Sequence, residues 1–411
     1  LLIESIEITE EYIYFCKSLL GLDDLNHLTK INREDLKKNL LIGDTHPLLK
    51  SLNSPKESNF NSIFSILRKQ NILLHHPYDL FKTSVEEFIN KAADDPLVLA
   101  IKITLYRVSK DSPIIEALMR AAENGKEVMT LVELKARFDE DNNIQWAKQL
   151  EQAGIHVVYG ILGLKTHTKI ALVVRKEKGK LRNYFHIGTG NYNSNTSRFY
   201  TDIGFLSTDP DISSDLIELF NYLSGFSKQK AYQKLLVSPK SLRKKFIFLI
   251  NREIENAKKG EKGEIIAKMN SLVDPEIIQL LYLASQTGVK IHLIIRGICC
   301  LYPQRKNLSE NIMVTSIIGH FLEHSRIFWF YNSNNSEVFI GSADWMKRNL
   351  DRRIEAVTPI EDLKLKSQLY DLLQTYINDN YYSWIMNKDG IYEKKGGGSK
   401  LNRSQIDLIK N

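Results

Sequence analysis

The chain has 411 residues, more than one ordinary hydrophobic core accommodates, so two or three domains are expected. Its 43% hydrophobic and 26% charged residues are typical of a soluble globular protein, and no apolar run reaches the roughly 18 residues that span a bilayer. The net charge of +7 allows a polyanionic partner but does not distinguish nucleic acid, phospholipid headgroups, nucleotides and inorganic phosphate polymers.

The cysteines and the amino-terminal residues indicate the setting of the protein. Cys16, Cys299 and Cys300 form neither a disulfide framework nor a zinc-binding pattern, which predicts a reducing, cytoplasmic environment. The chain begins at Leu1 without an initiator methionine and without a signal peptide, so a piece of a longer protein is expected.

The first elements follow a segment of mixed character. Residues 1–57 resemble the end of another domain, and the polar stretch 51–61 resembles a linker. Residues 71–81 then predict a short apolar strand that ends in two histidines and a Pro-Tyr turn. Residues 84–93 predict an amphipathic helix.

A β-α-β unit is predicted next. It consists of a strand at 97–106, a helix with Ser112 as N-cap, Pro113 in its first turn and Gly125 at its end, and a strand at 127–132. The same order recurs in a second half, with elements as follows: strand 263–271, Asp274 and Pro275 at the helix start, Gly288 at its end, and strand 290–295. The repeat favours an α/β fold with a mostly parallel sheet and right-handed crossovers.

A hairpin with reactive side chains follows the first unit. Residues 167–174 alternate with period 2, so His167 and Lys169 are expected on one strand face. The turn at 177–180 leads into a return strand that carries His186 and ends in Gly-Thr-Gly-Asn at 188–191. Taken alone, a histidine in a strand is usually structural.

The second half repeats this chemistry, which raises the weight of the functional interpretation. His324-Ser325-Arg326 corresponds to the His-x-Lys of the first half, and Gly-Ser-Ala-Asp at 341–344 corresponds to the glycine-rich turn. Two pseudo-symmetric halves could therefore face one cleft that holds two imidazoles and two cations.

Such a cleft suits phosphoryl transfer. Fixed cations stabilise the charge that spreads over phosphoryl oxygens, and a neutral imidazole can attack phosphorus while a second imidazole handles the proton. Further cations are expected at strand ends, where open α/β sheets bind ligands: Arg107, Lys135, Arg137 and Arg296. The sequence contains neither a Walker-type phosphate loop nor a kinase-like His-Arg-Asp loop.

The repeated His-x-Lys/Arg with Gly-Ser/Thr-x-Asn/Asp resembles the phospholipase D superfamily. In the first half, the aspartate expected five residues after the lysine is replaced by Val174, and in the second half the lysine is replaced by Arg326. Both departures argue against phosphodiester hydrolysis.

A closer resemblance fits these departures. The chain is similar, from about residue 40 to 390, to polyphosphate kinase of the first bacterial type. The motifs that carry this resemblance are KITLYR (102–107), ELKARFDE (133–140), KTHTK (165–169), HIGTGNYN (186–193), SRFYTD (197–202), IIRGICCL (294–301), EHSRI (323–327) and SADWMKRNLDRRIE (342–355).

The resemblance implies a role for individual residues. His167 takes the phosphoryl group, His186 is a second required histidine, and His324 is the partner from the other half. Tyr200 and Arg296 match positions that contact ATP. Lys169 and Arg326 are the cations expected beside the phosphates.

Arg107 and Arg137 match positions assigned to a magnesium site. A guanidinium has no lone pair for a metal, so these two arginines are expected to bind the phosphate oxygens that carry Mg²⁺.

The implied fold is α/β, with two phospholipase D-like domains, each a mixed β-sheet flanked by helices, preceded by the remnant of another domain. The implied boundaries are 1–57 for the end of the head domain, 58–235 and 236–395 for the two catalytic domains, and 396–411 for a frayed tail.

The implied activity is reversible transfer of the terminal phosphate of ATP to long-chain polyphosphate, with ATP or ADP and polyphosphate as partners and Mg²⁺ as cofactor. We expect a cytoplasmic homo-oligomer that can associate peripherally with the inner membrane and has no nucleic-acid partner. The alternatives are a phospholipase D-type phosphodiesterase or nuclease, and a non-catalytic polyanion-binding module.

Overall fold

The computed structural model describes residues 43–53, 63–106, 112–133, 140–161, 163–228, 231–397 and 400–410. The chain divides into two compact units, 1–42 and 43–411, and all described residues belong to the second unit. Most of the expected end of another domain (1–57) therefore lies outside the described residues, apart from a segment that contains the 3₁₀-helix η1 (Pro47–Asn53). The domain boundaries stay predictions.

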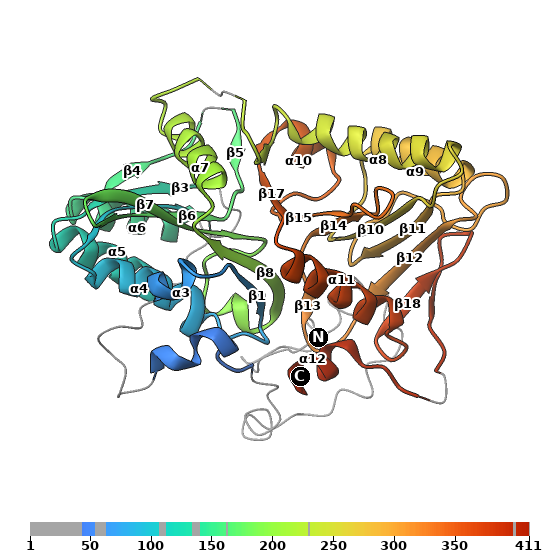
Figure 1. Ribbon diagram of the computed structural model, residues 1–411, viewed down its shortest axis with the longest axis horizontal. Helices are drawn as coiled ribbons and strands as arrows, with labels where there is room; N and C mark the ends of the chain where they lie inside the picture. Colours follow the sequence, from blue (N-terminus) through green and yellow to red (C-terminus); the bar gives the residue numbers. More distant parts are fainter. Residues whose placement is uncertain are drawn as a thin grey trace. The chain divides into compact units, whose positions relative to one another are not determined.

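The first half of the second unit is built on a mixed sheet with the order β1–β8–β7–β6–β2–β3–β4 (Figure 1). The strands are β1 (Ile72–His76), β2 (Val98–Leu105), β3 (Glu127–Val132), β4 (His156–Val158), β6 (Ile170–Glu177), β7 (Lys180–Gly188) and β8 (Tyr200–Ser207). Strands β2, β3 and β4 are parallel, whereas β6, β7, β8 and β1 are joined by antiparallel pairing.

The second half repeats this plan in a sheet with the order β19–β18–β12–β11–β10–β14–β15–β17–β9. Its strands are β9 (Leu236–Val237), β10 (Glu264–Met269), β11 (Lys290–Ile295), β12 (Ile312–Ile317), β14 (Ile327–Phe330), β15 (Glu337–Gly341), β17 (Ala356–Ile360), β18 (Ser383–Met386) and β19 (Tyr392–Lys394). Strands β10, β11 and β12 are parallel and the remaining pairs are antiparallel.

The internal repeat is therefore confirmed, and the order β8–β7–β6–β2–β3–β4 corresponds to β17–β15–β14–β10–β11–β12. The expectation of a mostly parallel sheet was wrong for the strands beside the histidines. Those strands are joined by hairpins, which produce antiparallel pairs, while the helical crossovers produce parallel ones.

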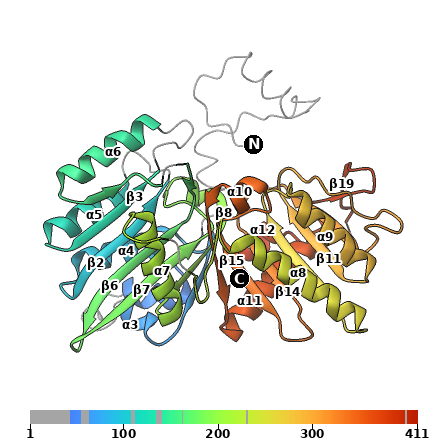
Figure 2. The same ribbon diagram turned by 90° about the horizontal axis from the view of Figure 1, so that it is seen from above.

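Helices cover both sheets and also separate them (Figures 1 and 2). The helices of the first half are α3 (Ile63–Leu67), the π-helical turn η2 (Lys82–Glu86), α4 (Glu87–Asp94), α5 (Pro113–Glu123), α6 (Glu140–Gln152), the 3₁₀-helix η3 (Thr196–Arg198) and α7 (Pro210–Leu223). Those of the second half are α8 (Leu242–Lys258), α9 (Pro275–Gln286), α10 (Lys347–Asp351), α11 (Leu363–Asn378) and α12 (Ser404–Lys410).

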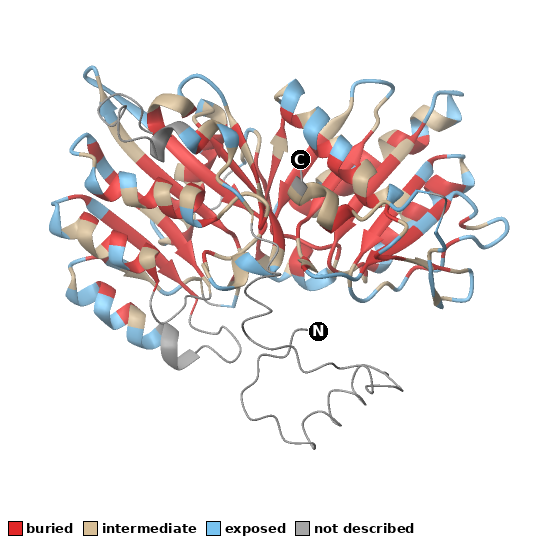
Figure 3. Cartoon of the chain, turned by 90° about the horizontal axis from the view of Figure 1, so that it is seen from below, coloured by how far each residue is buried: buried red, intermediate tan, exposed pale blue. Residues whose placement is uncertain are grey.

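Three hydrophobic cores hold these layers together. Helices α3, α4 and α5 pack on one face of the first sheet, and α8 and α9 pack on one face of the second. The third core lies between the sheets and contains side chains of α7 and α11 together with residues of both sheets, such as Phe185, Phe205, Ile266 and Ile340. Figure 3 shows buried residues running through both sheets and into the region where the halves meet. The shared core makes the two halves one packing unit.

The helix ends confirm the local signals in the sequence. The side chain of Asp274 accepts a hydrogen bond from the backbone N–H of Ile277 at 3.1 Å, as an N-cap should. Ser112 occupies the corresponding position before α5 without a side-chain cap bond. Gly125 (φ 74°) and Gly288 (φ 93°) adopt the left-handed conformation that ends α5 and α9.

Two sequence expectations need correction. Strand β6 begins at Ile170, so His167 and Lys169 precede it instead of lying on its face. The preceding residues form the short strand β5 (Lys165–Thr166), which pairs with β16 (Arg353–Ile354) of the second half. The tail expected to be frayed contains α12, in which Gln405 is fully buried.

An aromatic cluster of Phe246, Phe328 and Trp345 provides a test of the core between the second sheet and helices α8 and α9. Trp345 is fully buried and stacks on Phe328 with ring centroids 5.2 Å apart and an interplanar angle of 27°. We expect Trp345→Ala to lower the free energy of unfolding, measured by urea denaturation, by about 3–5 kcal/mol, because it leaves a large cavity. The matched control Phe226→Ala, at a ring that is 78% exposed, should change it by about 0.5 kcal/mol or less. Equal effects would contradict the packing described.

Candidate active site

The first histidine of the repeat is held by residues from the opposite half. The parallel pairing of β5 with β16 places the backbone N–H of His167 2.8 Å from the carbonyl oxygen of Ile354. The next residue, Glu355, accepts from the imidazole, with 2.9 Å between His167 Nδ1 and Glu355 Oε2. A proton on Nδ1 leaves the lone pair on Nε2, which is the nitrogen that could attack phosphorus.

The second histidine has the mirror arrangement. Strand β13 (Leu322–Glu323) pairs in parallel with the start of β8, and the N–H of His324 donates to the carbonyl oxygen of Thr201 at 3.1 Å. The next residue, Asp202, lies with its Oδ1 2.8 Å from His324 Nδ1. Thr189 of the glycine-rich turn donates its hydroxyl to the same carboxylate oxygen at 2.6 Å. Each histidine is therefore oriented by a carboxylate of the other half.

Both imidazoles are mostly buried, but a part of each remains open to solvent. The side chains of His167 and His324 are 12% and 14% exposed. Burial, and next the Lys169 ammonium, hold the pKa of His167 well below its usual value. Burial also lowers the pKa of His324, although Asp202 opposes this shift. Both rings are consequently neutral at neutral pH, as a nucleophilic imidazole must be.

The carboxylate behind His167 is fully buried. The amide of Asn349 donates to Glu355 Oε1, and burial raises the pKa of Glu355 to about 7, although Lys169 opposes the shift. Burial likewise lowers the pKa of Lys169 to about 7. The Lys169 Nζ donates to the carbonyl oxygen of His167 and lies 5.3 Å from the ring centroid of Tyr106, whose ring packs edge-on against His167.

Arg326 links the two halves beside the second histidine. Its Nη1 donates to the carbonyl oxygens of His324 at 2.8 Å and of Thr189 at 3.2 Å, and its Nε and Nη2 lie 3.2 Å from the Asp344 carboxylate. Lys169 and Arg326 were predicted to bind phosphates. Both are buried and donate to protein acceptors, so the contacts described here are those of cations that fix the histidine segments.

The two residues predicted to contact the nucleotide, Tyr200 and Arg296, are both linked to His324. The ring of Tyr200 is centred 5.3 Å from the imidazole. Arg296 donates through Nε and Nη2 to the side-chain oxygen of Asn270, whose amide in turn donates to the carbonyl oxygen of His324. Tyr200 and Arg296 are thus brought to one histidine, although they are separated widely in sequence.

His186 does not join the other two histidines. It is buried on the β7 face that belongs to the first core, and its Nδ1 lies 2.9 Å from the Tyr192 hydroxyl. A Cβ on Gly188 or Gly204 would come within 2.8 or 2.6 Å of its ring. Burial lowers its pKa to about 3. Its described contacts are therefore structural, and its catalytic role stays a prediction.

The glycine-rich turns serve close approach between strands. A Cβ on Gly190 would lie 2.2 Å from Asp202 Oδ2, and one on Gly341 would lie 2.3 Å from the carbonyl oxygen of Ala356. Glycine at Gly190 lets the first turn lie against β8, which carries Asp202. Glycine at Gly341 lets the second turn lie against β17, which directly follows Glu355.

The geometry of the site can now be set beside known proteins. Residues 62–229 match the family profile described as Polyphosphate kinase C-terminal domain 1, and residues 235–405 match Polyphosphate kinase C-terminal domain 2. The chain belongs to the polyphosphate kinase family.

Relatives within the polyphosphate kinase family extend over the whole chain. The polyphosphate kinases of Prochlorococcus marinus (strain MIT 9313) and Parasynechococcus marenigrum (strain WH8102) are 62% and 60% identical to it. Each alignment covers 100% of this chain and 59% of the relative. The chain thus spans little more than half the length of these relatives.

Solved structures confirm the predicted fold class. The crystal structure of polyphosphate kinase from Porphyromonas gingivalis superposes with a TM-score of 0.80 at 38% identity, covering 86% of this chain and 54% of that one. Phosphatidylserine synthase of Haemophilus influenzae superposes with a TM-score of 0.56 at 11% identity over 83% of this chain and 92% of that one, a likeness of fold alone.

Several predicted polyphosphate kinase residues cannot be placed. Arg107, Lys135 and Arg137 lie outside the described residues. Within the described ranges, no group of three or more His, Cys, Asp or Glu side chains could hold a metal ion. In those same ranges, no helix has the length and apolar composition to cross a membrane.

Asp202, Glu355, Asn270 and Thr189 were not singled out by sequence reasoning. Asp202 and Glu355 close the SRFYTD and DRRIE segments, each at the same place after a glycine-rich turn. That repeated acidic position is the signal that could have identified them.

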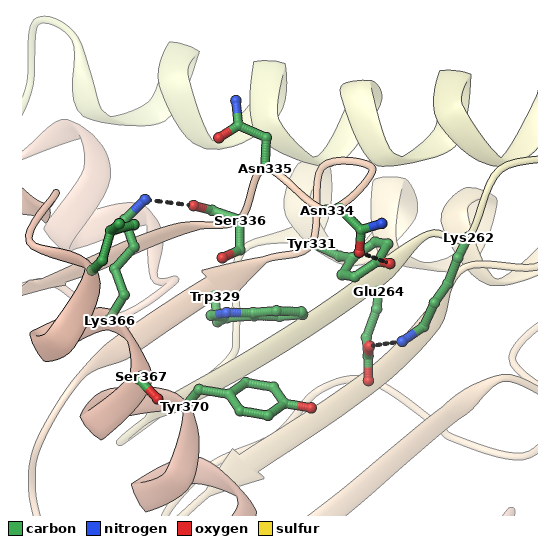
Figure 4. A pocket seen from close by; sticks show the side chains of 11 residues that line it. Lys262, Glu264, Trp329, Tyr331, Asn334, Asn335, Ser336, Lys366, Ser367 and Tyr370 are labelled. Atoms are coloured by element: carbon green, nitrogen blue, oxygen red, sulfur yellow. Dashed lines mark hydrogen bonds and ion pairs between the residues drawn. The ribbon is translucent and has the colours of Figure 1, made fainter.

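A hollow of about 350 Å³ is lined by no histidine and is not part of this site. Its wall includes residues at the end of β14 and at the start of α11, as Figure 4 shows for Trp329 and Lys366. Trp329 forms part of its wall with Tyr370, whose ring centroid is 5.1 Å away, and Lys366 donates to the carbonyl oxygen of Ser336 at the rim.

The buried Glu355 carboxyl predicts a pH-dependent contribution to stability. Because its folded pKa of about 7 exceeds the usual 4.5, the folded state binds the extra proton between these values, and stability is lost as the pH rises through them. Glu355→Gln removes this titration. The unfolding free energy of the variant relative to the wild type should therefore increase between about pH 5 and pH 8 in urea denaturation.

The control for this measurement is Glu361→Gln, at a side chain that is 61% exposed. A Glu355→Gln difference that stays constant with pH, or that falls as the pH rises, would contradict the buried environment of the carboxyl.

Proposed function

We propose that the protein transfers the terminal phosphate of ATP reversibly to inorganic polyphosphate through a phosphohistidine on His167. The observation that carries the proposal is the pair of neutral imidazoles, each oriented through Nδ1 by a carboxylate of the opposite half. The family and the repeat support phosphoryl chemistry, and the orientation of His167 supports its role as the nucleophile.

The first step forms a bond between His167 Nε2 and the γ-phosphorus of ATP. The bond from this phosphorus to the oxygen that bridges it to the β-phosphate breaks, and ADP leaves with the electron pair. Glu355 holds the proton on Nδ1 and stabilises the positive charge that develops on the ring. Protein groups thus lower the barrier by position and charge.

The second step reverses the chemistry toward another acceptor. A terminal oxygen of polyphosphate attacks the phosphorus, the bond from Nε2 to phosphorus breaks, and the chain is one phosphate longer. His324, held by Asp202, takes the proton from a protonated terminal oxygen. Transfer in the opposite direction returns phosphate to ADP by the same two steps.

The resemblance to polyphosphate kinase supplies the binding roles. Tyr200, whose ring is centred 5.3 Å from the His324 imidazole, and Arg296, which is linked to the His324 carbonyl oxygen through Asn270, would contact the nucleotide. Arg107 and Arg137 would bind phosphate oxygens that carry Mg²⁺. In this proposal Mg²⁺ comes with the ATP. We also propose that the protein is a cytoplasmic homo-oligomer that can associate peripherally with the membrane and does not bind nucleic acid.

Phosphodiester hydrolysis is the first rival. Its superfamily pattern requires an aspartate where this chain has Val174, an apolar residue of β6 that pairs with Asn183 of β7. A non-catalytic polyanion-binding module is the second rival. It predicts tight polyphosphate binding without turnover, weakening steeply with salt by analogy with counterion release from nucleic acids.

Labelling with γ-³²P-ATP tests the nucleophile. The wild-type protein should form an acid-labile, base-stable phosphoprotein, and His167→Ala should abolish it because the attacking nitrogen is gone. The exposed His320 provides the control His320→Ala, which should label as the wild type does. Persistent labelling of His167→Ala would refute the assignment, and release of an alcohol from a phosphodiester substrate would favour the hydrolase.

The two half-reactions separate the roles of the carboxylates. Asp202→Asn should slow the chase of label from the phosphoprotein into polyphosphate by about 10²–10⁴-fold, the range of general acid–base catalysis. It should leave formation of the phosphoprotein within about tenfold of the wild type, because Asp202 orients His324 and not His167. Single-turnover kinetics measures both rates, and an equal loss in both would contradict this division.

A further inference from the structure

The carboxy-terminal helix α12 carries one fully buried side-chain amide, which lies in the seam, the region where β13 of the second half pairs with β8 of the first. Gln405, in the first turn of α12, is 0% exposed. Its Oε1 accepts from the backbone N–H of Phe321 at 2.9 Å, and its Nε2 donates to the carbonyl oxygen of Phe321 at 2.9 Å. The amide thus pairs with both backbone groups of one residue, as a neighbouring strand would.

The same amide also holds a buried carboxylate. Gln405 Nε2 lies 2.7 Å from Glu323 Oε1, while the Thr201 hydroxyl donates to Glu323 Oε2 at 2.7 Å. Lys268 Nζ lies 2.9 Å from the same Oε2 and donates to the Ser325 hydroxyl at 2.6 Å. Three donors from α12, β8 and β10 therefore converge on a carboxylate of β13.

These contacts surround His324 in the sequence without touching its ring. Side chains alternate between the two sides of an extended segment, so Glu323 and Ser325 point one way and His324 points the other. Glu323 and Ser325 are both tied to Lys268, and Thr201 joins Glu323 to the strand that carries Asp202. The position of the imidazole relative to its carboxylate is therefore set from the opposite side of the segment.

The helix itself is firmly seated. The backbone N–H and the hydroxyl of Ser404 donate to Asp379 Oδ2 at 2.7 and 2.6 Å, and Asp379 is fully buried at the end of α11. A Cβ on Gly319 would lie 2.4 Å from Gln405 Oε1, so glycine is needed there for the amide to reach Phe321. Both sides of the contact are built for the glutamine.

We propose that Gln405 is a positioning residue, which fixes Glu323 and thereby holds His324 against Asp202. The inference rests on the proposed function for its kinetic consequence, because His324 acts in the transfer from phosphohistidine to polyphosphate. It assigns to the carboxy-terminal helix a part in the second half-reaction.

The first experiment compares Gln405→Leu with Asn402→Ala in the whole protein. The leucine fills a similar volume but leaves Glu323 without the amide donor. Asn402→Ala removes a hydrogen bond from the segment just before α12 to the carbonyl oxygen of Asn378, and Asn402 touches neither Phe321 nor Glu323. Gln405→Leu should slow the chase of label into polyphosphate by about 10- to 100-fold, in line with the cost of a misplacement near 1 Å. It should leave labelling of His167 within about threefold of the wild type.

Asn402→Ala should leave both rates unchanged within about twofold. The positioning role would be overturned if Gln405→Leu had the chase rate of the wild type. It would also be overturned if both half-reactions slowed by the same factor while the thermal midpoint fell.

A second variant gives a readout that a loss of stability would not produce. In Gln405→Glu, the new carboxylate faces Glu323, which is paired with Lys268. The other titratable groups of the neighbourhood are Tyr376 beneath the Lys268 ammonium, Tyr382 beside Gly319 and Asp379 bonded to Ser404. When protonated, the new carboxyl group can donate to Glu323, as the amide does, so the chase rate relative to the wild type should rise as the pH falls from about 8 to 6. A ratio that is flat or that falls over this range would contradict the proposal.

A third measurement is independent of turnover. The His324 ring resonance, assigned by comparison with His324→Ala, should titrate at a different pH in Gln405→Leu than in the wild type, because a displaced ring changes both the burial that lowers its pKa and the Asp202 contact that raises it. An unchanged titration would contradict the proposal. If the wild type itself formed no phosphoprotein, the proposed function would fail while this NMR result could still stand, so the two failures are distinguishable.

Discussion

The site depends on an exchange of backbone pairing between the two halves. The residues before His167 pair with β16 of the second half, and the residues before His324 pair with β8 of the first. In each case the residue that follows the paired strand position is the acid that binds the imidazole. Because main-chain hydrogen bonds fix both partners, the distance between imidazole and carboxylate is set by strand register and not by flexible side chains alone.

This arrangement concentrates buried charge at the seam. Arg326 with Asp344, and Lys268 with Glu323, are ion pairs between side chains that are almost fully buried. Such pairs are costly unless every partner is present, because burial removes the water that would solvate the charges. Their contacts to Thr189 and Thr201 cross from one half to the other, so the cost is offset only when the halves are docked. Buried ion pairs and hydrogen bonds, as well as hydrophobic packing, therefore determine how the two halves dock.

Much of the framework could be predicted from local signals. The strands predicted at 127–132 and 290–295 coincide with β3 and β11, because apolar runs bounded by glycine and proline are clear in one sequence. The repeat located His167 and His324, the two histidines that carboxylates of the opposite half orient. Neither signal could pair His167 with Glu355, which is 188 residues further along the chain. Gln405 was missed because a polar residue in a polar tail looks solvated until the tail is docked.

The shared core has an implication for the origin of the molecule. Each half contributes an imidazole to one pair and a carboxylate to the other, and helices α7 and α11 are enclosed between the sheets by both halves. Two identical copies related by a twofold axis would satisfy all of these requirements in the same way. Fusion into one chain then frees each copy to diverge. Asp202 now stands where the other half has Glu355, and Lys169 stands where the other half has Arg326, so the two halves keep the same plan with different side chains.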